Sequence, residues 1–209
     1  MGHPDLKYGD SGHARGAVQN DGAGRVVAKK AWIVAVAAAV LVCVSAFVAR
    51  DVSLRGAQQA ALVSEAVDEH IAAIAAAGPE VVSSDRHTVK PWFQGKLPFS
   101  FNLPQALPVD VTLDGANLVQ VEGHAAAQLL FSIGKHRASV FVRQDNGDFN
   151  APMHLFYRMH ARFRPLQAEH NGFRVEGFVT RGGLEFDAVS DADPARLGEL
   201  VRAIEQAQE

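Results

Sequence analysis

The chain has 209 residues, which suits one domain of ordinary size with short appendages and makes a second large domain unexpected. Its formal net charge is −3. Residues 1–30 hold five Lys or Arg against three Asp, whereas the rest of the chain holds 15 basic and 20 acidic residues. The acidic balance of this larger part argues against direct nucleic-acid binding. The single cysteine, Cys43, excludes an internal disulfide framework and a thiolate zinc site, so the fold must rest on its hydrophobic core.

Residues 1–30 form a leader with six Gly, scattered charges and few large apolar side chains. Such a composition cannot offset the entropy of ordering, so we expect the leader to be disordered in isolation. His3 and His13 have no cysteine companions and predict no metal site.

Residues 31–49 form the most apolar stretch of the chain, without one charged side chain in 19 positions. As a helix they reach roughly 28 Å, close to the thickness of the hydrocarbon core of a membrane. Lys29 and Lys30 precede the stretch and Trp32 suits the interface, so a cytoplasmic N-terminus is predicted. A buried helix of a soluble protein and a cleaved signal peptide are the alternatives.

Residues 50–78 are predicted to form a helical stalk, which Gly78 and Pro79 would end. Its apolar positions recur at helical spacing, as one stripe of Val63, Val67, Ile71 and Ile74. The stripe either pairs with a second copy, giving a homodimer, or packs on the chain's own outer domain. We favour the second.

Residues 79–209 show the pattern of an α+β domain. Turn-forming pairs punctuate apolar runs at Asp114-Gly115, Asn146-Gly147, Asn171-Gly172 and Gly182-Gly183. They predict an antiparallel sheet with strands at 118–122, 126–133, 138–143, 154–163, 173–179 and 184–189. A final helix is expected after Asp193, with Pro194 in its first turn and a buried face of Leu197, Leu200, Val201 and Ile204.

The stretch S-D-R-H-T-V-K-P-W-F-Q-G-K, residues 84–96, combines many side-chain chemistries. Asp85, His87 and Lys90 would suit acid–base catalysis, but no recognisable nucleophile, phosphate loop or metal motif completes a mechanism. The structural alternative is that Trp92 and Phe93 fill the core while the polar members bond to backbone. We therefore expect neither an enzyme nor a cofactor.

The predicted strand at 154–163 has a basic face made by Arg158, His160 and Arg162, which Arg164 extends. This face would suit an anionic ligand, a lipid headgroup or an acidic partner, and His154, His160 and His136 would suit a response to pH or metal. An ordinary solvated strand face is the alternative, and we favour it.

The same stretch also resembles a family signature, in the residues Ser84, Asp85, His87, Thr88, Val89, Lys90, Pro91, Trp92, Phe93, Gly95 and Lys96. They are similar to a block that follows the membrane stalk in the periplasmic region of bacterial transmembrane anti-sigma factors. Less specific likeness continues to about residue 205, through Leu113-Asp114-Gly115, the paired strands around Ala126 to Val142, and the segment at 178–197.

The resemblance implies a periplasmic sensor whose cytoplasmic partner is an extracytoplasmic-function sigma factor. Such proteins usually hold the sigma factor with a small cytoplasmic domain bearing a His-x-x-x-Cys-x-x-Cys zinc motif. Residues 1–30 lack this motif, so sigma binding by the leader does not follow from the likeness. Three explanations for the missing motif remain open: the leader folds on its partner, the protein is a sensor that does not bind a sigma factor, or a misassigned start codon omits the cytoplasmic domain.

The sequence thus predicts a single-pass inner-membrane protein with a periplasmic C-terminal domain. It would act on a sigma factor or another regulatory protein through protein contacts. The alternative is a membrane-tethered periplasmic module that binds a ligand or a metal and has no sigma-factor role.

Overall fold

The structure, a computed structural model, describes residues 21–144 and 166–209. The chain divides into two compact units, with the boundary between Leu54 and Arg55. Both units contain part of one long helix, and the second unit contains all the strands described.

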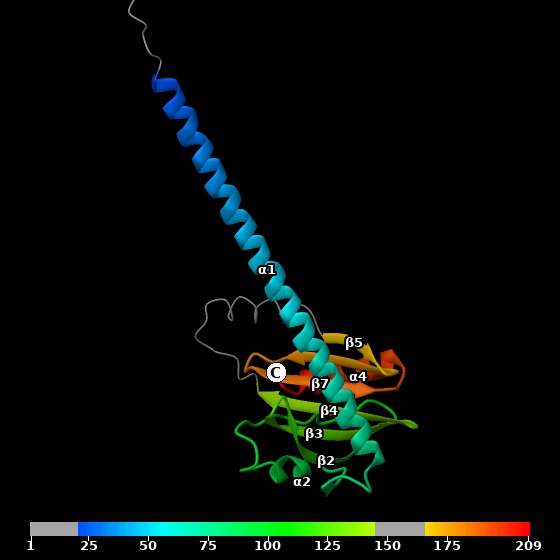
Figure 1. The fold of residues 1–209 in the computed structure, drawn as a ribbon. Coiled ribbons are helices and arrows are strands. Elements are labelled where there is room, and N and C mark those ends of the chain that lie inside the picture. Colours follow the sequence, from blue (N-terminus) through cyan, green and yellow to red (C-terminus); the bar gives the residue numbers. More distant parts are fainter. Residues whose placement is uncertain (1–20, 145–165) are drawn as a thin grey trace, which may run out of the picture. The chain divides into compact units, whose positions relative to one another are not determined.

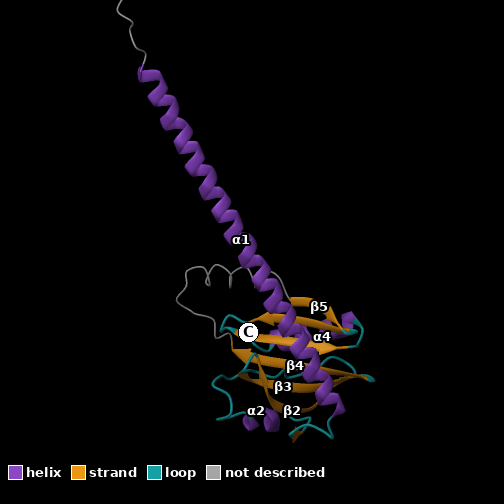
Figure 2. Ribbon diagram, in the orientation of Figure 1, coloured by secondary structure: helices purple, strands orange, loops and turns teal. Residues whose placement is uncertain are grey.

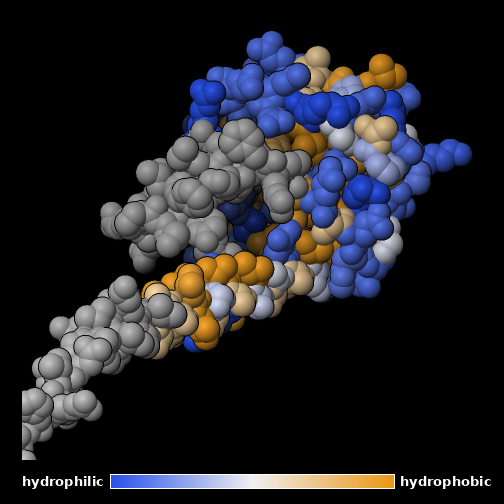
Figure 3. Space-filling view, turned by 90° about the horizontal axis from the view of Figure 1, so that it is seen from above, coloured by the Kyte–Doolittle hydropathy of each residue, from blue (hydrophilic) through white to orange (hydrophobic). Residues whose placement is uncertain are grey.

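Helix α1 runs without interruption over Asp21–Ala75 and so includes the predicted apolar segment and the predicted stalk as far as Ala75 (Figure 1). It begins inside the leader, of which residues 1–20 lie outside the described residues. Of the side chains that the structure describes up to Leu54, the large apolar ones are exposed, among them Trp32, Leu41 and Phe47. In Figure 3 hydrophobic residues gather along this helix, whereas the visible surface of the sheet domain is mainly hydrophilic. By length and composition, α1 is able to cross a membrane.

Seven strands in the described residues form one antiparallel sheet in the order β1-β2-β3-β4-β7-β6-β5 (Figures 1 and 2). The helices α2 Arg86–Trp92 and α4 Pro194–Gln206 complete the domain, which is therefore α+β as predicted. The strands are β1 Val81–Val82, β2 Val111–Val121, β3 His124–Ile133, β4 His136–Gln144, β5 Leu166–His170, β6 Phe173–Val179 and β7 Leu184–Ser190.

Two of the predicted turns lie where the sequence puts them. Asn171 and Gly172 both have positive φ, 51° and 83°, and they join β5 to β6 as a tight hairpin requires. Gly182 and Gly183 lie in the turn between β6 and β7. The Asn146-Gly147 pair and the predicted strand at 154–163 fall outside the described residues.

The predicted turn at Asp114-Gly115 is wrong, because both residues lie inside β2. The pairing of β2 with β3 shifts register between Leu113 and Gly115, which marks a bulge and not a chain reversal. At Gly115, where φ is 154°, a Cβ would collide with the Val81 carbonyl oxygen. Glycine here permits the close approach of strand β1, which the pattern of turn residues alone does not reveal.

One face of the sheet carries the larger core. Side chains that alternate along β3, β4 and β7 meet Val89 and Phe93, together with Leu197, Leu200 and Ile204 of helix α4, Pro194–Gln206. The Asp193 side chain accepts a hydrogen bond from Ala195 N, and Pro194 lies in the first turn of α4. The predicted C-terminal helix and its cap are confirmed; of its predicted apolar face, Val201 is partly buried.

The opposite face is covered in part by the last turns of α1. Val63, Ala66 and Val67 pack there with Phe141 and Val189 in a second apolar cluster. The predicted docking of the stripe is confirmed for Val63 and Val67 but is wrong for Ile71 and Ile74, which are 41% and 49% exposed. His70 occupies the buried position of the next turn, so the end of the docked face is polar.

Candidate functional site

Residues 84–96 contain a short helix, α2 Arg86–Trp92, that the sequence does not predict by periodicity. Asp85 caps it, since its Oδ1 accepts a hydrogen bond of 2.8 Å from the His87 backbone N–H. The Asp85 carboxylate therefore orients the helix and not the His87 imidazole. His87 Nε2 instead accepts from Arg86 Nε at 3.3 Å, so Asp85 and His87 do not form a catalytic pair.

The apolar side of α2 fills the core as the structural reading predicts. Val89 and Phe93 are buried, and Phe93 makes edge-to-face contacts with Trp92 and Phe101 at centroid distances of 4.9 and 5.6 Å. The Lys96 ammonium lies 3.2 Å from the centroid of the Trp92 ring. Gly95 has a φ of 75°, the left-handed conformation that lets the chain turn after the helix.

The polar side of α2 faces a cavity of 680 Å³. Arg86, His87 and Lys90 line it, opposite the last turn of α4. Lys90 Nζ donates to Asn102 Oδ1 at 2.8 Å. Asn102 is in turn tied to Gln208, which accepts from the Asn102 backbone N–H at 3.0 Å and donates to its carbonyl at 2.7 Å. The segment at residues 85–90, which the sequence singles out, is thus linked through Asn102 to the C-terminal end of the chain.

A second polar group lies beneath α1, on the other face of the sheet. His70 Nδ1 and Ser139 Oγ are 2.7 Å apart, and Gln128 Nε2 donates to the same hydroxyl at 3.3 Å. All three side chains are fully or almost fully buried. Burial lowers the pKa of His70 to about 4, and the negative charge of Asp191 opposes this only in part. Neutral imidazole is therefore the form that the interface holds.

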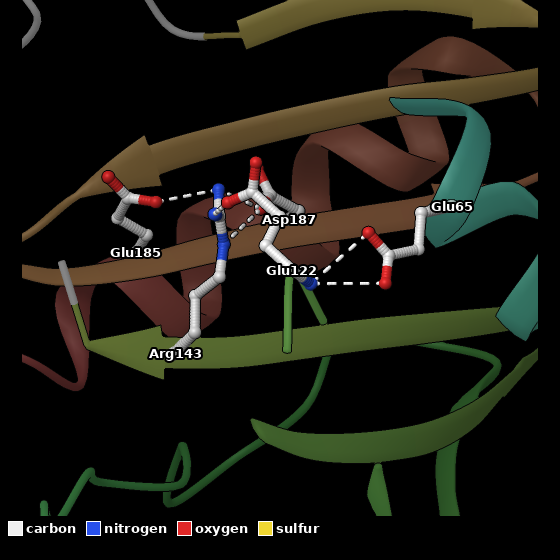
Figure 4. Close-up of polar contacts among 5 residues, drawn as sticks. All are labelled: Glu65, Glu122, Arg143, Glu185 and Asp187. Carbon is white, nitrogen blue, oxygen red and sulfur yellow. Dashed lines mark hydrogen bonds and ion pairs between the residues drawn. The ribbon is translucent and has the colours of Figure 1, made fainter. Parts of the chain in front are cut away.

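A charged cluster extends this group around Arg143 (Figure 4). The guanidinium contacts Glu122, Glu185 and Asp187 at 3.1, 2.6 and 3.0 Å, and Glu65 of α1 accepts hydrogen bonds from the Glu122 backbone N–H. Burial raises the pKa of Asp187 more than the charge and hydrogen bond of Arg143 lower it, and the negative charge of Glu122 raises it further. Burial works to lower the pKa of Arg143, but the three carboxylates together raise it, so Arg143 stays charged.

The proposed anion-binding face of Arg158, His160, Arg162 and Arg164 lies outside the described residues, as does His154. His136 is described, and its Nδ1 lies 3.1 Å from Asp191 Oδ1 at an exposed position. Within residues 21–144 and 166–209, no three His, Cys, Asp or Glu side chains are placed to hold a metal ion.

Sequence reasoning missed several polar residues that the structure brings together, namely Arg86, Asn102, Gln208, His70, Arg143 and Asp187. Of these residues, only Arg86 could have been identified from the sequence. Arg86 and Lys90 are four residues apart, so any helix through them places both on one face. The others depend on contacts between residues 44 to 106 positions apart in the chain.

No protein-family model matches this chain, and no curated protein matches it. Among solved structures it is similar to the complex of Pseudomonas aeruginosa MucA and MucB, with 16% identity and a TM-score of 0.35 over 49% of this chain and 33% of that one. A crystal structure of MucB with MucA(peri) gives the same identity and TM-score, over 34% of its chain. The chain thus spans about a third of the matched chains, and a TM-score this low does not establish a shared fold.

Proposed function

We propose that this protein is a single-pass regulator of the anti-sigma-factor type. Its N-terminus lies in the bacterial cytoplasm, helix α1 crosses the inner membrane, and the sheet domain lies in the periplasm. It acts through contacts with a sigma factor or another regulatory protein, and it catalyses no reaction.

The observation that carries this proposal is the dual nature of helix α1. Its residues 35–49 are exposed and almost all apolar, while its last turns are part of the folded domain through Val63, Ala66, Val67 and His70. A change in the sheet that expels these side chains alters the helix directly, as a transmembrane regulator requires. The signature at residues 84–96 adds the resemblance to anti-sigma factors.

The contacts of the polar residues support a role without catalysis. Within residues 21–144 and 166–209, the pair that comes nearest to a nucleophile and its base is Ser139 and His70, at 2.7 Å. Both side chains are 0% exposed, so a substrate cannot reach the hydroxyl. Asp85 is engaged in capping a helix. These groups stabilise the fold and hold α1 on the sheet.

Gene deletion in the host bacterium tests the regulatory role. Loss of the protein should raise transcription from one set of promoters that depend on an extracytoplasmic-function sigma factor, and the full chain should restore the basal level. In parallel, cross-linking in intact membranes and capture through a C-terminal tag should recover that sigma factor or a protein that binds it. A Lys135→Gln chain, altered at an exposed turn, serves as the control and should behave as the parent.

Two genomic observations sharpen the test. A neighbouring sigma-factor gene, or an in-frame upstream start that encodes His-x-x-x-Cys-x-x-Cys, supports the proposal. If neither is present, transcription is unchanged and capture recovers no regulatory protein, the proposed function is wrong.

A further inference from the structure

Helix α2 separates its side chains into two classes by direction. Arg86 and Lys90 are four residues apart and His87 and Lys90 are three apart, which places all three on one side of the helix. Val89 and Phe93 enter the core on the other side. The apolar side accounts for the stability of the segment, but core packing gives no reason for three basic side chains along the cavity.

The cavity is open to solvent and is large enough for a small molecule. Its volume of 680 Å³ lies within the range of roughly 300–1,000 Å³ that is usual for ligand pockets. Buried Leu103 and Pro104 provide an apolar wall, and Gln105 and Gln206 provide amide groups. An organic molecule would therefore meet both apolar surface and hydrogen-bonding groups.

Within the part of the chain that the structure describes, the charged side chains that line the cavity are all basic. Among the described residues, no carboxylate pairs with Arg86 or Lys90 and none lines the cavity. The same domain does neutralise other arginines: Arg137, Arg143, Arg174 and Arg196 each contact a carboxylate. Arg86 Nε and Lys90 Nζ instead donate hydrogen bonds to a ring nitrogen of His87 and to the side-chain oxygen of Asn102, neither of which is a carboxylate.

The end of helix α4 does not cancel this charge. Its C-terminal turn lines the cavity and carries roughly half an elementary negative charge from its peptide dipoles. Glu205 and Glu209, the acidic side chains at this end of the chain, line a different cavity, so within the first cavity the two full positive charges on α2 exceed the partial charge of the helix end. The guanidinium fork of Arg86 and the remaining donors of Lys90 are suited to the oxygens of a carboxylate or a phosphate.

We propose that this cavity binds a small organic anion, with a carboxylate or phosphate group at Arg86 and Lys90 and an apolar body against Leu103 and Pro104. The site goes beyond the proposed regulatory function and stands without it. It gives residues 84–96 a role in ligand binding in addition to their packing.

Calorimetric titration of the full chain in a nonionic detergent at low ionic strength tests the site. The probes are hexanoate, inorganic phosphate and, as a neutral analogue of the first, hexanamide. We expect saturable binding of hexanoate or phosphate and none of hexanamide; the anion that binds identifies the source as a carboxylate or a phosphate. The Arg86→Gln/Lys90→Gln chain should bind at least tenfold more weakly, whereas Lys135→Gln should bind as the parent does.

A footprint on the unaltered chain removes the dependence on a folded variant. Saturating probe should slow acetylation of Lys90 by a water-soluble reagent at least threefold, read by mass spectrometry. Lys135 of the same molecule, exposed in the β3–β4 turn, should react at its unliganded rate. The proposal is overturned if neither anion binds, if the double variant binds as tightly as the parent, or if bound probe leaves Lys90 unprotected.

Discussion

At the scale of single residues, the stability of the domain should be most sensitive to pH and to substitution at the buried polar side chains under α1. His70 is 0% exposed, its Nε2 has no hydrogen-bond partner within the described structure, and its ring lies edge-on to Phe173 at 5.1 Å. Arg143 holds a nearly buried carboxylate, Asp187. A proton gained by His70 would create a charge away from water. Loss of the Arg143 charge would leave Asp187 without its partner, also away from water.

We expect acid to destabilise the domain through His70. Because burial lowers its pKa from 6.5 to about 4, the imidazole gains a proton on unfolding as the pH falls through this window, and stability is lost. Between pH 7.5 and pH 5 the parent should lose about 2 kcal/mol more unfolding free energy than His70→Gln, since each pKa unit corresponds to about 1.4 kcal/mol. Urea unfolding at the two pH values measures this. His87→Gln, altered at an exposed histidine, should follow the parent; equal losses in His70→Gln and the parent would sink the idea.

Removing Arg143 should cost far more than removing a surface arginine. In Arg143→Met the nearly buried Asp187 loses its partner, which is expected to lower the unfolding free energy by about 3 kcal/mol. Arg137→Met, whose side chain is 60% exposed beside Asp114, should cost under about 1 kcal/mol. Denaturant unfolding compares the two. The double change Arg143→Met/Asp187→Asn should recover part of the loss, and equal costs for the two single variants would contradict the assignment.

At the scale of elements, α1 and α2 each place their side chains in two different environments. The last turns of α1 pack on the sheet through only part of the predicted stripe, and α2 combines an apolar side in the core with a basic side on the cavity. In both cases the direction of each side chain around the helix decides its role. Neither division is visible in the hydrophobic pattern alone.

Docking of α1 should depend on Val67 and not on Ile71. Val67 is 0% exposed against the sheet, so Val67→Ala is expected to lower the unfolding free energy by about 2 kcal/mol and to speed hydrogen exchange near the end of α1. Ile71→Ala removes a side chain that is 41% exposed and should have a much smaller effect. A larger effect of Ile71→Ala would mean that the helix docks through a different face.

At the scale of the whole molecule, the proposed function depends on topology. One described helix is long and apolar enough to cross a membrane, and the positive charges that precede the apolar stretch predict the direction of insertion. The folded domain follows the helix in the sequence. Placing that domain in the periplasm is therefore a claim that can be tested without knowledge of its partner.

Single-cysteine labelling should reveal this orientation. In a Cys43→Ala background, which removes the only native thiol, Asp191→Cys should react with a membrane-impermeant maleimide in cells with a permeabilised outer membrane. Ser11→Cys should react only after the inner membrane is broken. The parent Cys43, inside the apolar stretch, should stay unlabelled until detergent is added. Labelling of Ser11→Cys before that of Asp191→Cys would reverse the topology.

Much of the fold is predictable from local pattern. The apolar stretch, the helical stalk, strands near 118–133, 138–143 and 173–189, and the capped helix after Asp193 all follow from periodicity and turn residues. Strand β1 has only two residues and is too short to carry such a pattern, whereas β5 has five residues that alternate and was not predicted. Gly115 looks like a turn residue because a bulge also favours glycine. The cavity escapes prediction because its walls come from residues more than 100 positions apart.

The sequence by itself determined that a long apolar helix precedes an α+β domain, because hydrophobic spacing and capping are local properties of the chain. It also singled out residues 84–96. Only the tertiary structure decided that Asp85 caps a helix, that Arg86 and Lys90 face a cavity without a carboxylate partner, and that His70 lies buried under α1. Burial and charge pairing depend on tertiary contacts between segments that are distant in the chain, and the local sequence pattern does not specify those contacts.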